Sequence, residues 1–133
     1  MNISPVCVLC ALGIASAGAQ AQIVVVGATS ASAAMSREQV ADAFMGKMSG
    51  VEPLDQAERA PIREEFYSKI IGKSASQVKS YWAKISFTGR GTPPKEYSNS
   101  TEIKKALSGN PNAIGYVEKS AVDSAVRIVF EGR

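Results

Sequence analysis

Two arginines flank a predicted helix start near the middle of the chain, and these residue types suit the binding of an anion. The stretch VEPLDQAERAPIREEFY (51–67) indicates a short strand at 51–54, a polar turn and a helix beginning at Pro61. Proline is favoured at a first helical position. Ala60 is then the N-cap, and alanine offers no oxygen to the free N–H groups of the first turn. Those N–H groups, with Arg59 and Arg63 beside them, favour a bound anion.

A second interpretation of the same residues stays open. Glu58, Glu64 and Glu65 stand among the arginines, and they are able to neutralise them on an ordinary solvated surface. Arg63 also falls at the third helical position, where a cation opposes the helix dipole. The residues alone therefore predict an anion site or a charge-balanced surface helix.

A hydroxyl-rich loop follows the first predicted strand. Residues 22–27 (QIVVVG) form an apolar run typical of a buried strand. Ser30 and Ser32 lie in the loop after it, and loops at strand ends are where α/β folds place ligands. The alternative is a plain polar loop. Nucleotide binding is not indicated, because Gly27 lacks further glycines at the required spacing and no P-loop lysine follows.

The usual catalytic residue types are missing or poorly placed. The chain has no histidine, and its two cysteines, Cys7 and Cys10, lie in the apolar N-terminal segment. No metal-ligand spacing is visible, and Asp55 next to Gln56 is typical of a turn. We therefore expect no enzyme activity, no metal and no cofactor.

The beginning of the chain predicts export. An apolar run at 6–17 is followed by small residues that fit an A-x-A cleavage pattern. We expect a signal peptide at residues 1–21, a domain at 22–133 and a periplasmic location. The alternative is an apolar strand or helix at the start of a cytosolic domain. The net charge of +3 is spread along the chain without a basic cluster, so nucleic-acid binding is not expected.

The remaining pattern predicts alternating strands and helices. Ser36 with Gln39, and Ser74 with Gln77, have the spacing of capping boxes that begin helices. A further helix is expected at about 98–108, and the last strands at 113–117 and 126–130, with a short helical turn between them. The segment 87–95 (FTGRGTPPK) predicts an irregular loop, and Trp82 a core position. The order of these elements indicates an α/β fold.

Three separated segments carry a resemblance to a known family. They are AFMGK (43–47), the stretch 51–67 already described, and NPNAIGYV (110–117). The chain resembles the short exported phosphate ABC transporter substrate-binding proteins, which are similar to one lobe of the type II periplasmic binding proteins. The segment YWAKISFTGRGTPPKE (81–96) also fits the short family. The resemblance covers nearly all of residues 22–130, and it implies a small mixed sheet flanked by about four helices.

The resemblance also implies where a ligand would bind. In the full-length phosphate binders, the matching turn carries an arginine and then a Gly-Ser pair whose hydroxyl contacts phosphate. Here Gln56 stands at the position of that arginine, and Arg59-Ala60 at the position of the pair. The expected oxyanion site therefore consists of Gln56, Arg59, Ala60 and Arg63, with Ser30 or Ser32 approaching from the first loop.

The expected function follows from that site. It is the binding of inorganic phosphate or a similar oxyanion outside the cytoplasm, with a membrane transporter, a sensor or a second copy as partner. The alternative is a periplasmic interaction module that keeps the fold without the ligand.

Overall fold

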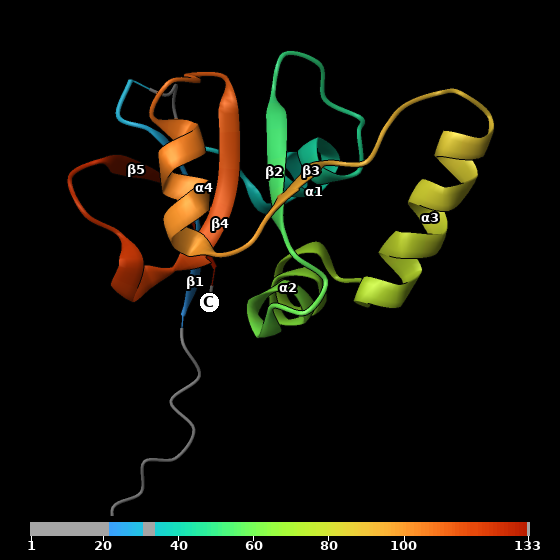
Figure 1. Ribbon diagram of the computed structural model, residues 1–133, viewed down its shortest axis with the longest axis horizontal. Helices are drawn as coiled ribbons and strands as arrows, with labels where there is room; N and C mark the ends of the chain where they lie inside the picture. Colours follow the sequence, from blue (N-terminus) through green and yellow to red (C-terminus); the bar gives the residue numbers. More distant parts are fainter. Residues whose placement is uncertain (1–21, 31–33, 133) are drawn as a thin grey trace, which may run out of the picture.

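The computed structural model describes residues 22–30 and 34–132, which form one five-stranded sheet with helices on both faces (Figure 1). The predicted signal peptide (1–21) and Ser32 lie outside the described residues. In chain order the elements are β1 (Ile23–Ala28), α1 (Arg37–Phe44), β2 (Glu52–Gln56), α2 (Pro61–Phe66), η1 (Tyr67–Ile71), α3 (Ala75–Phe87), β3 (Lys95–Tyr97), α4 (Ser100–Leu107), β4 (Ala113–Glu118), η2 (Lys119–Ala121) and β5 (Val126–Glu131).

The sheet is mixed, and its strand order is β3-β2-β4-β1-β5. β2 is parallel to both β3 and β4, whereas β1 is antiparallel to β4 and to β5. Four strands therefore run in one direction and β1 alone runs against them. The expected small mixed sheet is confirmed.

Each face of the sheet has its own apolar core. Along β1, Val25 packs with α1, α2, η1 and α3, while Val24 and Val26 pack with α4, as the two-residue period of a strand requires. In Figure 1, α4 lies in front of β4, and α1 lies behind the sheet. The Ile103 side chain of α4 packs closely against β4 at Gly115, where an added Cβ would lie 2.7 Å from Ile103 Cγ2.

The predicted helix signals are confirmed. Ser36 and Ser74 both close capping boxes with the residue three positions on, and Asn99 caps α4. Pro61 begins α2 with Ala60 as an N-cap that makes no side-chain hydrogen bond. The helix then continues as one π-helical stretch, η1, and ends at Gly72 with φ +85.

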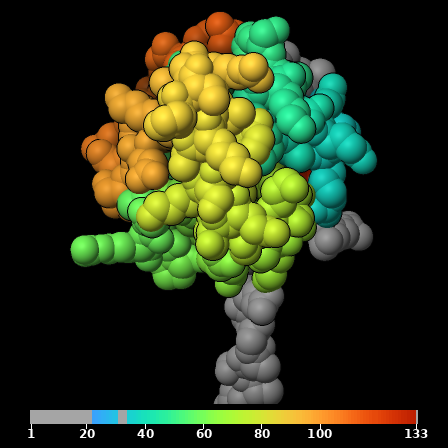
Figure 2. All heavy atoms as spheres, turned by 90° about the vertical axis from the view of Figure 1, so that its right-hand side faces the viewer, coloured from blue at the N-terminus to red at the C-terminus, as the bar shows by residue number. Residues whose placement is uncertain are grey.

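The strand β3 was not predicted from the sequence. It is three residues long and forms the sheet edge beside β2. α3 lies at one end of the long axis of the molecule and fills the centre of the face in Figure 2. Trp82 on this helix is 8% exposed, so the predicted core position is confirmed.

Candidate functional site

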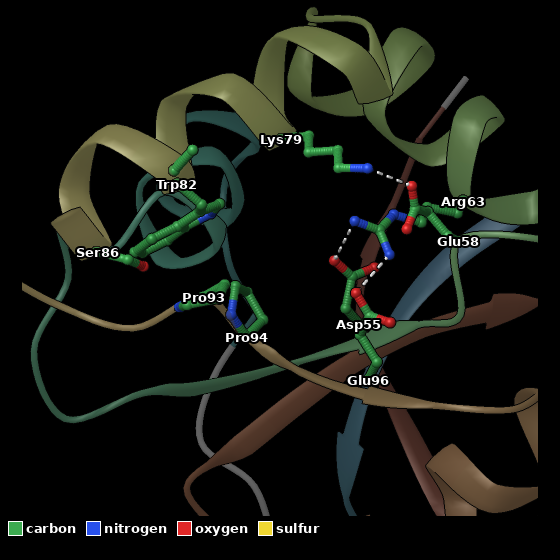
Figure 3. A pocket seen from close by; sticks show the side chains of 10 residues that line it. Asp55, Glu58, Arg63, Lys79, Trp82, Ser86, Pro93, Pro94 and Glu96 are labelled. Carbon is green, nitrogen blue, oxygen red and sulfur yellow. Dashed lines mark hydrogen bonds and ion pairs between the residues drawn. The ribbon is translucent and has the colours of Figure 1, made fainter.

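The turn between β2 and α2 separates two hollows in the surface of the domain. The first, which we call the carboxyl-edge hollow, has a volume of about 470 Å³. It is lined by Gln56, Ala60, Pro61, Ile62, Ser98, Asn99, Ser100, Thr101, Glu118 and Ala121. The second, the Trp82 hollow, has a volume of about 250 Å³ (Figure 3). It is lined by Asp55, Glu58, Arg63, Lys79, Trp82, Ala83, Ser86, Pro93, Pro94 and Glu96.

The carboxyl-edge hollow lies where three parallel strands end. Its lining comes from the connection between β2 and α2, the connection between β3 and α4, and the residues after β4. Ligands of open α/β sheets bind beyond the carboxyl ends of the strands. Because α4 begins here, its N-terminal N–H groups and the hydroxyls of Ser98 and Thr101 are near the hollow.

Gln56 closes the inner side of this hollow and is 2% exposed. Its Nε2 donates to the carbonyl oxygen of Tyr116 at 2.9 Å and to Ser100 Oγ at 3.1 Å. Ser100 Oγ in turn donates to a carboxylate oxygen of Glu118 at 2.7 Å. The side chains thus form a chain of hydrogen bonds that ends on Glu118, the one ionisable residue among those lining the hollow.

The predicted residues do not all gather here. Gln56 and Ala60 line the carboxyl-edge hollow, but Arg63 lines the Trp82 hollow. Arg59 is exposed in the turn and lines neither. Ser30 follows β1, which runs antiparallel to β2 and β4. It therefore lies at the opposite end of the strands from Gln56. The hydrophobic periodicity of the sequence predicts where strands lie but not their relative directions, so it could not show that Ser30 and Gln56 are far apart.

Arg63 is a buried structural cation, 7% exposed. Its Nη1 donates to the carbonyl oxygen of Gln56 at 3.0 Å and to Glu96 at 2.8 Å, and its Nη2 lies 3.8 Å from Asp55. Burial alone would lower the pKa of Arg63, but the Glu96 hydrogen bond and the Asp55 charge outweigh it and raise the pKa. The guanidinium is therefore permanently charged and already committed to two carboxylates.

Asp55 is the centre of a buried polar cluster. The sequence had predicted that this residue belongs to a turn. It is 2% exposed and accepts hydrogen bonds from the hydroxyls of Tyr67, at 2.6 Å, and Tyr116. Burial raises the pKa of Asp55, although both tyrosines and Arg63 act in the opposite direction. Burial beside the Asp55 carboxylate also raises the pKa of each tyrosine, so both hydroxyls keep their protons as donors.

Four further residues line the carboxyl-edge hollow and were not predicted from the sequence, namely Ser98, Ser100, Thr101 and Glu118. The capping spacing of Asn99 and Glu102 locates the start of α4 in the sequence, but its position beside Gln56 depends on the pairing of β3 with β2. Among the described residues, no group of three or more His, Cys, Asp or Glu is arranged to hold a metal ion. No described helix has the length and apolar character to cross a bilayer.

The fold is that of one lobe of the substrate-binding proteins of phosphate transport. The chain superimposes on an ABC-type phosphate transport receptor from Vibrio cholerae with a TM-score of 0.64 and 14% identity, covering 81% of this chain and 45% of that one. It superimposes on a putative phosphate ABC transporter substrate-binding protein from Clostridium perfringens, solved with bound phosphate, with a TM-score of 0.65 and 20% identity, covering 81% and 44%.

A third solved structure agrees, namely PstS from Borrelia burgdorferi, with a TM-score of 0.60 and 10% identity, covering 82% of this chain and 46% of that one. No protein-family model matches the chain, and no curated protein matches it in sequence. The expected resemblance in fold is therefore confirmed, and the chain spans less than half the length of these structures.

Proposed function

We propose that this chain is an exported oxyanion-binding lobe, with inorganic phosphate as its leading ligand, and that the carboxyl-edge hollow is its binding surface. The observation that carries the proposal is the meeting of three strand ends and the start of α4 at one hollow. Helix starts and hydroxyls at such a place supply donors to oxyanions. Of the predicted set, Gln56 and Ala60 belong to this surface, and Arg59 lies in the adjacent turn.

Glu118 narrows the kind of oxyanion that fits. A carboxylate repels a fully deprotonated anion, but it accepts a hydrogen bond from a P–OH group. Phosphate keeps at least one such hydrogen at neutral pH, whereas sulfate has none. When phosphate binds, the Ser100 hydroxyl is free to turn from Glu118 to a phosphate oxygen. The proposed site therefore prefers phosphate to sulfate.

The lobe does not complete the site alone. No cation lines the carboxyl-edge hollow, and a dehydrated phosphate requires charge-assisted hydrogen bonds on several sides. We expect a second surface to cover the ligand, provided by a membrane transporter, a sensor or a second copy of the chain. Binding by the isolated chain is then weak, in the range of about 1 mM, corresponding to about 4 kcal/mol.

Calorimetric and NMR titrations of the purified protein test the proposal. Phosphate is expected to shift the amide signals of residues 98–101, and sulfate is not. The Glu118→Gln variant is expected to lose the preference because the neutral amide no longer repels sulfate, while Glu38→Gln on the far helix α1 serves as the matched control. No shift at about 10 mM phosphate, well above the expected dissociation constant, would sink the proposal.

A second candidate function is a docking lobe without a ligand. It is favoured by the hydrogen bond from Ser100 to Glu118, which already brings a carboxylate to the start of α4, and by the commitment of Arg63 to Asp55 and Glu96. A photo-crosslinker at Thr101 tests this candidate in the cell envelope. A specific crosslinked partner together with no phosphate shift supports it, and a clear phosphate shift without a partner contradicts it.

A further inference from the structure

The charges of the chain are divided unevenly along the sequence. Between Glu65 and Glu96 there are six Lys and Arg residues and no Asp or Glu, so all 12 acidic residues stand elsewhere with the other nine cations. The six are four to six positions apart and form no run in the sequence, but the fold gathers them on α3 and the segments next to it. They are Lys69, Lys73, Lys79, Lys84, Arg90 and Lys95. The α3 end of the molecule is therefore basic.

α3 is attached to the domain along a narrow strip of its surface. Of its 13 residues, Val78 and Trp82 are buried, and Ile85 packs against the same core. Phe87 follows two positions after Ile85, and a rotation of about 100° per residue places it on the opposite side of the helix. Phe87 is 92% exposed, and it is the one large apolar side chain open to solvent among residues 22–30 and 34–132. This ring is therefore not part of the core.

The end of α3 is fixed by hydrogen bonds that leave Phe87 uncovered. The Thr88 hydroxyl donates to the carbonyl oxygen of Ile85 at 2.9 Å, and the Arg90 N–H donates to the same oxygen at 3.1 Å. Gly89, with φ +72, makes the left-handed turn that commonly ends a helix. The chain after Phe87 thus folds back toward Ile85, on the other side of the helix from the ring.

Two unpaired cations accompany Phe87 in the α3 tip, which we define as residues 84–92. Lys84 lies one helical turn before Phe87, on the same side of α3, and Arg90 follows the turn. Within the part of the chain that the structure describes, neither side chain has a hydrogen bond or an ion pair. Every residue of the tip except Ile85 is exposed. The tip therefore presents an aromatic ring together with two free positive charges.

The charge and the position of the tip indicate what it fits. Two copies that met through this tip would bring like charges together, which is unfavourable. Figure 1 shows α3 at one end of the long axis, and the loop after it forms the outer corner of that end. A projecting tip of this kind reaches a flat surface. The surface of an anionic bilayer suits both of its features, because lipid phosphates attract cations and an aromatic ring enters the apolar boundary beneath them.

We propose that the α3 tip docks the domain onto a bilayer that contains anionic lipids. Phe87 enters the boundary between the headgroups and the acyl chains, and Lys84 and Arg90 lie beside the lipid phosphates. One ring and a few charges support weak, reversible docking. The inference does not depend on phosphate binding at the carboxyl-edge hollow, because no residue of the tip lines that hollow.

Sedimentation of the purified protein with lipid vesicles tests the docking. Vesicles of phosphatidylglycerol and phosphatidylcholine in equal parts are expected to bind the protein at least about 10-fold more tightly than vesicles of phosphatidylcholine alone. Added salt is expected to weaken the binding, because the charges involved are exposed. Equal binding to the two kinds of vesicle overturns the proposal. The absence of binding to the mixed vesicles also overturns it, and would leave the basic tip to an acidic protein.

Charge variants locate the contact on the molecule. Lys84→Gln is expected to weaken binding to the mixed vesicles several-fold, because each cation near an anionic surface adds to the attraction. Lys105→Gln is the matched control. It removes the same charge at a side chain that is 74% exposed, on α4, which packs on the other face of the sheet. Equal effects of the two variants contradict the placement of the contact at the α3 tip.

Phe87 variants test the insertion of the ring. Phe87→Ser is expected to weaken vesicle binding at least about 10-fold, because the apolar area that enters the bilayer is lost. In Phe87→Trp, the new indole is expected to shift its emission to shorter wavelength on the mixed vesicles. Trp82 is 8% exposed, so the native chain is expected to show no such shift. Unchanged binding of Phe87→Ser, or no shift in Phe87→Trp, contradicts the proposal.

Discussion

Arg63 fastens the first turn of α2 to the end of β2 by donating a 3.0 Å hydrogen bond to the carbonyl oxygen of Gln56. The two residues then face different hollows, because the Gln56 side chain lies toward Ser100 and the Arg63 side chain lies toward Glu96. The stretch with the strongest anion signal in the sequence therefore divides its polar groups between two surfaces. One of them, the carboxyl-edge hollow, carries the proposed phosphate site.

Replacing Arg63 tests its structural role. Arg63→Met removes the cation and leaves Asp55 buried without its charge partner, so we expect a loss of about 3–5 kcal/mol in the free energy of unfolding. Urea denaturation followed by circular dichroism measures this loss. Arg59→Ala is the matched control, because Arg59 is exposed in the turn just before α2 and surface changes usually stay within about 0.5 kcal/mol. Equal effects of the two variants contradict the assignment of Arg63 as a structural cation.

The buried position of Asp55 makes stability depend on pH. Burial raises the pKa of Asp55 above its ordinary value of 3.8, so the folded chain holds a proton on this carboxyl group more readily than the unfolded chain does. The stabilisation from this shift is complete below the ordinary pKa, and it is lost as the pH rises through the raised pKa of the folded state. Asp55→Asn cannot titrate, so the free energy of unfolding of the native chain minus that of Asp55→Asn is expected to fall with rising pH above 3.8.

Denaturation curves of both proteins between about pH 4 and pH 8, the range in which shifted carboxyl groups of this kind titrate, measure that difference. Subtracting the variant removes the contribution of other titrating groups that the two chains share. A difference that rises with pH would mean that the pKa of Asp55 is lowered in the folded state.

The elements near the site were predictable where their signals are local. Pro61 begins α2 and Ala60 is its uncapped N-cap, as the sequence indicated, because capping chemistry depends on a few neighbouring residues. The ion pair of Arg63 with Glu96 was not predictable, because Glu96 lies 33 positions away and the pairing of β3 with β2 brings it close. β3 itself is three residues long and follows two prolines, which gives no strand pattern.

The contact between β4 and α4 depends on the missing side chain of Gly115. Gly115→Ala places a Cβ 2.7 Å from Ile103 Cγ2, so we expect a loss of about 1–3 kcal/mol from overpacking. Thermal denaturation measures it. Gly109→Ala is the control, because nothing lies within 4 Å of its added Cβ. Combining Gly115→Ala with Ile103→Leu removes the Cγ2 and is expected to recover part of the loss, and no recovery would point to another cause.

The N-cap of α2, Ala60, makes no side-chain hydrogen bond, so a polar residue at this position is expected to increase the stability of the domain. Ala60 has φ −71 and ψ 123, the extended geometry of an N-cap, so Ala60→Ser is expected to stabilise the domain by about 0.5–1 kcal/mol. Ser36→Ala, which breaks an existing capping box, is expected to cost about as much. Chemical denaturation compares the two variants. A destabilising Ala60→Ser would show that the serine hydroxyl does not reach the N–H groups of the first turn.

The position of β1 in the sheet determines when the domain is able to form during synthesis. Among residues 22–30 and 34–132, β1 is the first strand, and it pairs with β4 and β5, with Ile23 opposite Glu118 and Val24 opposite Glu131. Such contacts between distant residues delay folding until both partners are present. The ribosome must therefore release residues as far as Glu131 before the centre of the sheet closes, and until then β1 stays open to chaperones.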